Sequence, residues 1–215
     1  EVNLTKELYL TWFPIWNHNH SKFIFTDIDE KDKLFVYDVK KRKVTLTVKD
    51  FTNLNTINNF YCWSYDNKTF YATNNTEANC EILALNTDNS KIEKIYTGTE
   101  NKVSKISDIV SSPNNRYISF VCDITHKIEK NEQIIKEIVA YDLFNKKFKQ
   151  VTGISPNLSS SKPIKEKYGN FNPQFTPDSS KIVFESNIDC NNEIYIVNVD
   201  GTGLKNLSNS PANDT

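Results

Sequence analysis

The chain repeats one local pattern four times, and this repetition restricts its fold more than any other feature. The four copies occupy 14–25, 62–71, 110–120 and 173–184. Each contains an extended piece, a polar turn rich in Asn or Asp, a basic residue near the exit of the turn, and then an apolar run. This order is typical of a β-hairpin.

A second hairpin follows each copy, so that every repeat is expected to hold four short strands. The third strands are apolar runs that end in Asp or Asn, at 34–38, 82–86, 138–142 and 194–198. The fourth strands are expected at 44–47, 95–97, 148–152 and 204–208. Four-stranded antiparallel units that recur at roughly 40–50 residues are typical of β-propeller blades, which stack face to face and so bury both faces of each sheet.

We therefore predict an all-β fold, a β-propeller of four-stranded antiparallel blades within a single domain, 1–215. The approximate repeats are 10–50, 58–98, 106–153 and 170–209. A β-sandwich is the alternative, but it does not require the same turn at the same offset four times.

The four repeats are expected to form an arc of a larger, six- to eight-bladed propeller. Residues 1–5 resemble a stray final strand of a neighbouring blade, and 210–215 resemble a linker to the next one. A four-bladed ring is the alternative. An open arc would expose one apolar face at each end, which predicts self-association.

The fourth repeat resembles the repeat of the TolB-like (WD40-like Pro-Asp) propeller family. The resemblance rests on the turn at 172–187 with its Thr-Pro-Asp sequence, the Glu-Ile-Tyr strand with Asp-Gly turn at 192–203, and the segment 204–214. The other repeats match loosely, and together they extend the resemblance over nearly the whole chain. It implies a periplasmic or secreted bacterial protein that binds partners at a propeller face. The same repeat also occurs in propellers attached to prolyl-oligopeptidase-type serine peptidases.

The residues of this motif are interpreted as structural. Pro177 fixes φ at the start of its turn, and Asp178 can accept backbone N–H bonds there. Lys181 is expected to direct its charge outward. The aromatic residues expected to pack between blades are Trp16, Trp63, Phe120, Phe175 and Phe184.

Two enlarged connections are predicted on one face of the propeller. A long loop, 123–136, joins the second and third strands of the third repeat, and a long connection, 153–170, leads into the fourth. Because binding sites are often built on long loops of a rigid scaffold, we expect an acidic or polar protein partner at this face. A tolerated surface insertion is the alternative. The candidate binding residues are Lys127, Lys130, Lys136, Lys162, Lys165, Lys167 and Tyr168.

The rest of the sequence offers little chemistry. With Lys+Arg 26 against Asp+Glu 27 the net charge is −1, which argues against nucleic acid as a partner. No apolar run is long enough for a membrane span. There is no nucleophile elbow, zinc-protease motif or phosphate-binding glycine loop, so we expect no catalytic residue and no cofactor.

Several polar residues are of types that can bind metals, but we interpret them as structural or solvated. His18 and His20 lie in the first turn, and His126 lies alone in the long loop. The acidic segment 27–32 lacks the glycine and spacing of a calcium loop. The cysteines are expected to be buried or half-buried thiols, with one disulfide as an option in an oxidising compartment: Cys62, Cys80, Cys122 and Cys190. With only 5 Gly, the tight turns are expected to use Asn instead.

These observations predict a non-enzymatic TolB-like propeller that acts as a protein-interaction scaffold in the bacterial periplasm or cell envelope. The alternatives are part of the propeller of a serine peptidase, and a propeller that binds a sugar or peptide.

Overall fold

The computed structural model describes residues 11–27, 33–49, 61–76, 79–128, 131–153, 169–187 and 191–209. Within them, four antiparallel sheets of four strands each follow one another in chain order. The first sheet contains β1 (Thr11–Trp16), β2 (Lys22–Asp27), β3 (Lys33–Asp38) and β4 (Lys43–Lys49). The second contains β5 (Tyr61–Trp63), β6 (Thr69–Asn75), β7 (Cys80–Asn86) and β8 (Ile92–Thr97).

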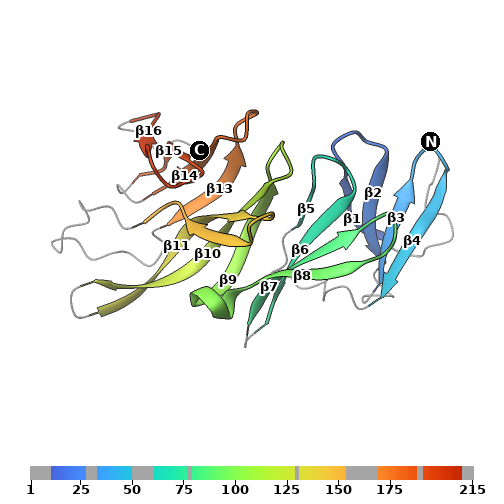
Figure 1. The fold of residues 1–215 in the computed structure, drawn as a ribbon, viewed down its shortest axis with the longest axis horizontal. Helices are drawn as coiled ribbons and strands as arrows, with labels where there is room; N and C mark the ends of the chain where they lie inside the picture. Colours follow the sequence, from blue (N-terminus) through green and yellow to red (C-terminus); the bar gives the residue numbers. More distant parts are fainter. Residues whose placement is uncertain are drawn as a thin grey trace.

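The third and fourth sheets repeat this order. The third contains β9 (Val103–Ser111), β10 (Tyr117–Ile128), β11 (Asn131–Asp142) and β12 (Lys147–Gln150), after a short 3₁₀ turn at Gly98–Asn101. The fourth contains β13 (Asn170–Phe175), β14 (Lys181–Ser186), β15 (Glu193–Asn198) and β16 (Lys205–Asn206). The sheets succeed one another along the long axis of the molecule, with β1–β4 at one end and β13–β16 at the other (Figure 1). The predicted fold class, four propeller blades of four antiparallel strands, is confirmed.

The strand pairing shows that the four sheets are copies of one module. In every sheet the first strand ends on a pair that immediately precedes the turn. These pairs are Trp16↔Phe23, Trp63↔Phe70, Ser111↔Ile118 and Phe175↔Ile182. The residues aligned from the sequence therefore occupy matching places on successive blades.

The turn after each first strand places one residue in the left-handed region, where glycine is the usual choice. Here the residues are His20 (φ 55°), Asn67 (φ 63°), Asn115 (φ 56°) and Ser179 (φ 61°). The expectation that Asn replaces Gly in tight turns is thus correct at two of the four. Asp178 accepts the backbone N–H of Ser180 at 3.1 Å and the hydroxyl of Thr176 at 2.6 Å, the role predicted for it.

At three of these four left-handed positions, the side chain also joins one blade to the next. Asn67 Oδ1 accepts the backbone N–H of Asn19 at 3.1 Å, and Asn115 Oδ1 accepts that of Asp66 at 3.0 Å. Ser179 Oγ accepts the N–H of Asn114 at 3.0 Å. Glycine would tolerate the backbone but could not form this bond, which gives a physical reason for its absence from these three turns.

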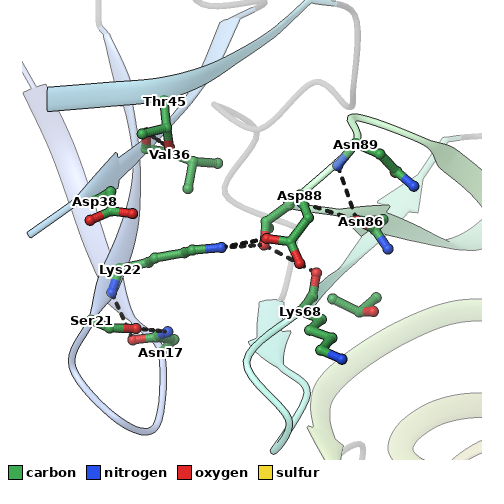
Figure 2. A network of polar contacts seen from close by, with 12 residues as sticks. Asn17, Ser21, Lys22, Val36, Asp38, Thr45, Lys68, Asn86, Asp88 and Asn89 are labelled. Atoms are coloured by element: carbon green, nitrogen blue, oxygen red, sulfur yellow. Dashed lines mark hydrogen bonds and ion pairs between the residues drawn. The ribbon is translucent and has the colours of Figure 1, made fainter. Parts of the chain in front are cut away.

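A second polar link between blades comes from Lys22 of β2. Its Nζ lies 2.8 Å from Asp88 Oδ1 in the turn after β7 (Figure 2). The same Nζ lies 3.4 Å from Thr87 Oγ1. Because the Lys22 side chain is largely buried while Asp88 is exposed, this contact fixes the lysine stem against the second sheet.

Apolar side chains fill the three interfaces between consecutive sheets. Trp63 lies in the first interface, where its Nε1 donates to the Ile15 carbonyl oxygen at 3.0 Å. Phe120 lies in the second interface and Phe184 lies in the third. Phe175 is partly buried and packs against the apolar cluster of the third interface. Aliphatic side chains surround these aromatic residues in all three interfaces, and burial of both kinds favours the stacking of the blades.

The first blade differs from these expectations. Trp16 does not pack between blades: its side chain is 45% exposed, because no described sheet precedes the first one. The outer side of this sheet is nevertheless not the bare apolar face expected at an arc end. It carries an aromatic layer in which all four members are buried: Phe23, Phe25, Phe35 and Tyr37.

The last blade agrees better with an exposed end face. Val183, Ile194 and Ile196 of the fourth sheet are only half-buried. Ile138 and Ala140 hold the positions of Ile194 and Ile196 in the third sheet, where the fourth sheet covers them completely.

Candidate functional site

The predicted long loop at 123–136 is instead an extension of two strands, so that prediction is wrong. β10 and β11 pair without interruption from Tyr117↔Asp142 to Ile128↔Asn131. The physical reason is the alternation of the sequence, since Ile135 faces the core and Ile134 is 66% exposed. The resulting hairpin projects past the other strands of its blade (Figure 1). We call residues 123–136 the projecting hairpin.

Two of the seven candidate binding residues lie in the part of the projecting hairpin that the structure describes. Lys127 is exposed, whereas Lys136 donates to Asp123 Oδ1 at 2.8 Å and is only one-third exposed. Its charge is therefore already paired. The other candidates lie outside the described residues: Lys130, Lys162, Lys165, Lys167 and Tyr168.

A buried carboxylate lies at the base of the projecting hairpin. Glu137 of β11 is fully buried, and its Oε2 accepts the Thr152 hydroxyl at 2.5 Å and Asn170 Nδ2 at 3.1 Å. Burial raises the pKa of Glu137 to about 7, although the hydrogen bonds from Thr152 and Asn170 oppose that rise. The Glu137 site thus joins the third blade to the first strand of the fourth.

The sequence suggested that His126 lies alone, but the structure gives it a close neighbour. Its Nε2 lies 2.9 Å from Glu137 Oε1. This is the distance of an ion pair, but the two groups are not aligned as a hydrogen bond, and neither atom has a hydrogen-bond partner among the described residues. Burial lowers the pKa of His126, which favours the neutral imidazole.

A glutamate recurs at one aligned position of the third strand in three repeats, as Glu81, Glu137 and Glu193. Glu193 is also buried and accepts the Ser208 hydroxyl, which corresponds to Thr152 in the third repeat. The carboxylate therefore has a structural role in the blade. The repeated Glu-Ile sequence could have indicated the position of Glu137. The neighbouring His126 could be recognised only from the register of the hairpin.

The remaining candidates have structural surroundings. His18 Nε2 lies 3.2 Å from the Trp63 carbonyl oxygen, and its exposed ring stacks on Tyr65 at 4.0 Å. Cys80 and Cys122 are buried free thiols and Cys62 is a half-buried one. In the segment 27–32, residues 28–32 lie outside the described residues, as does Cys190. Across the described ranges, no three side chains of His, Cys, Asp or Glu gather in one place.

A groove of about 560 Å³ lies at the opposite end of the same two blades. Its lining comes from the strand ends and turns of the third and fourth sheets and mixes both charges. It includes Tyr117, Asp142, Lys147, Lys149, Asn198 and Asp200. The groove could not be predicted from the sequence, because its shape depends on how the two sheets diverge.

Comparison with solved structures identifies the architecture. TolB from Acinetobacter baumannii superposes with a TM-score of 0.60 at 16% identity, over 90% of this chain and 42% of that one. The fold is a TolB-like β-propeller. A putative TolB from Agrobacterium tumefaciens gives 0.50 at 14% identity, over 92% and 80%. A puromycin-hydrolyzing peptidase from Mycobacterium tuberculosis gives 0.59 at 14% identity, over 93% and 30%.

These likenesses concern the fold. The chain spans less than half of the Acinetobacter TolB. No family profile and no curated protein sequence matches it. Among the described residues, no helix of this TolB-like propeller has the length and apolar character needed to cross a membrane.

Proposed function

We propose that this TolB-like propeller is a non-enzymatic protein-interaction scaffold of the bacterial periplasm or cell envelope. The partner binds the face that bears the projecting hairpin and the connection 153–170. The observation that carries the proposal is the hairpin itself, which extends past its blade and presents Ile134 at 66% exposure beside the exposed Lys127. A projecting strand pair offers unpaired backbone groups at its edge, which partner chains recognise by strand addition.

A photo-crosslinking experiment tests this assignment. A photoreactive amino acid replaces Ile134, and a matched variant carries it at Phe144, which is 87% exposed in the turn after β11 at the other end of the blade. After irradiation in a bacterial envelope extract, we expect a discrete adduct from position 134 and none from position 144. Equal labelling from both positions, or no adduct from 134, would contradict the proposal.

Charge reversal adds a second readout in the same assay. Lys127→Glu should weaken the position-134 adduct if the partner is acidic, because it replaces an exposed positive charge with a negative one. Lys43→Glu, at the exposed first residue of β4 in the first blade, is the control and should leave the adduct unchanged. An unchanged adduct in Lys127→Glu would remove the acidic character from the proposed partner.

The second candidate function is that of a propeller attached to a serine peptidase. The similarity to the Mycobacterium tuberculosis peptidase, over 30% of that chain, favours it. The test is hydrolysis of chromogenic peptide amides by the longest natural form of the protein. Serine-dependent hydrolysis would favour this function over the scaffold. A sugar- or peptide-binding propeller is the third candidate, and a thermal-shift screen with oligosaccharides and short peptides tests it.

A further inference from the structure

The groove between the third and fourth blades is large enough to hold a small molecule. Its volume of about 560 Å³ lies within the range of about 300–1,000 Å³ that is typical of small-molecule sites. Tyr117 and Ala140, from the middle strands β10 and β11, contribute a half-buried and a buried part of its lining. β12 contributes a wall from the third blade, and the turn after β15 contributes a wall from the fourth. The groove is therefore an open space between two rigid sheets.

Two lysines of β12 line the same wall of this groove. Lys147 and Lys149 are two residues apart on one strand, so their side chains lie on the same face of the third sheet with their Cβ atoms roughly 7 Å apart. Both side chains are exposed. Neither ammonium group has a hydrogen bond or an ion pair with any other residue that the structure describes. Both are therefore available to a ligand.

The acidic residues of the groove do not pair with these lysines because each is held by other groups. Asp142 lies directly opposite Lys147 in the register, but its Oδ2 accepts Nε and Nη2 of Arg116 at 3.1 and 2.9 Å. Its Oδ1 accepts backbone N–H groups of the turn after β11. On the facing wall, Asp200 Oδ1 accepts the backbone N–H of Thr202 at 2.9 Å and its hydroxyl at 2.6 Å. With Arg116 included, three basic side chains meet two acidic ones, which leaves the groove with a net charge of +1.

Lys149 and Asp200 line the groove from neighbouring blades without forming an ion pair. The stem of Lys149 lies against the turn that holds Gly201 (φ 83°), where an added Cβ would come within 3.2 Å of Lys149 Cε. The hydrogen bonds from Thr202, and to a smaller extent the charge of Lys149, lower the pKa of Asp200, so its carboxylate is ionised at neutral pH. Asp200 Oδ2 accepts no hydrogen bond from the described part of the chain. The groove therefore offers two ammonium donors from one blade and one carboxylate acceptor from the other.

This arrangement favours an anionic ligand that also carries a hydroxyl group. Two lysine ammonium groups on flexible stems can reach the two negative charges of one small molecule, and charge-assisted hydrogen bonds to carboxylate or phosphate oxygens are strong. A hydroxyl group of the same molecule can donate to the free Oδ2 of Asp200. A cationic ligand is disfavoured, because it would meet two unpaired ammonium groups.

We propose that the groove binds a small organic dianion that carries a hydroxyl group, either a hydroxy-dicarboxylate or the phosphate ester of a short polyol. Lys147 and Lys149 pair with its anionic oxygens, Asp200 accepts its hydroxyl hydrogen, and Tyr117 and Ala140 contact its carbon atoms. The site goes beyond the proposed scaffold function and does not depend on it, because the groove lies at the end of the two blades opposite the projecting hairpin.

Isothermal titration calorimetry with malate and, separately, with glycerol 3-phosphate tests the proposal. We expect one site per chain for at least one of these dianions, an affinity that falls as NaCl is added, and no binding of uncharged glycerol. The dianion with the higher affinity identifies the anionic group that the site prefers. The analogues without a hydroxyl group, succinate and propyl phosphate, should bind several-fold more weakly, and equal affinity would contradict the role of Asp200.

Lys147→Gln and Lys149→Gln should each reduce the affinity for the dianion at least about fivefold, because each removes one charged hydrogen bond. Lys43→Gln is the matched control and should leave the affinity unchanged. Lys43 is the exposed first residue of β4 and lies opposite Asp38, as Lys147 lies opposite Asp142, but it does not line the groove. The proposal is overturned if the wild-type protein binds neither dianion, if both groove variants bind as the wild type does, or if Lys43→Gln loses affinity to the same degree.

Discussion

The hydrogen bonds between neighbouring turns make a quantitative prediction at Asn115. Its backbone lies in the left-handed region (φ 56°), and its Oδ1 accepts the Asp66 N–H of the preceding blade at 3.0 Å. Asn115→Ala removes this bond, worth about 0.5–1.5 kcal/mol, and places an alanine Cβ in a conformation that costs about 1–2 kcal/mol. Since Asn already bears part of that conformational cost, we expect a net destabilisation of about 2 kcal/mol.

Asn115→Gly separates the two contributions. It loses the same bond but relieves the backbone strain, and its more flexible unfolded chain costs about 0.5–1 kcal/mol. We therefore expect Asn115→Gly to be destabilised by about 1 kcal/mol or less. The measurement is the free energy of unfolding from urea titrations followed by tryptophan fluorescence.

Lys146→Gly is the control. Lys146 has φ 54° in the turn after β11, and its side chain makes no hydrogen bond to another blade within the described structure. Relief of strain should therefore dominate, and the variant should be neutral or slightly more stable. If Asn115→Gly gained stability as Lys146→Gly does, or if Asn115→Ala were no worse than Asn115→Gly, the reasoning about the cross-blade bonds would be refuted.

Three further predictions concern packing, pH and thiol chemistry. Trp63→Ala should lower the free energy of unfolding in urea by about 3–5 kcal/mol, because Trp63 is buried between the first two sheets. Trp16→Ala, at the matching half-exposed position, should lower it clearly less. Equal losses in the two variants would contradict the packing described above. Hydrogen bonds from Thr176 and Ser180 lower the pKa of Asp178 to about 2, below the value in the unfolded chain, so its contribution to stability is present above pH 4 and disappears as the pH falls from 4 to 2. Asp178→Asn should flatten this part of the melting-temperature profile, and an unchanged slope would assign the acid sensitivity to other carboxylates. Burial raises the pKa of Cys80 to about 11, so its thiol and that of Cys122 should react with a disulfide reagent slowly in the native state and rapidly in urea; fast native labelling would show that the blades open.

Features that depend on neighbours in sequence were predictable for this protein. The repeated turn, the alternation of apolar residues and the Asp or Asn at the end of each third strand determine four similar hairpin pairs, and these give the propeller fold. The role of Asp178 in its turn follows for the same reason, since all of its partners lie within two residues.

Features that depend on register or on the packing of two sheets were decided only by the tertiary structure. The segment 123–136 forms a paired hairpin because Ile124 meets Ile135 across the strands, and this pairing also turns His126 toward Glu137. Asn67 and Asn115 look like ordinary turn residues in the sequence, yet each accepts a hydrogen bond from the preceding blade. Local patterns specify which strands form, but which side chains meet depends on how the finished sheets stack, because the contacting atoms come from residues far apart in the chain.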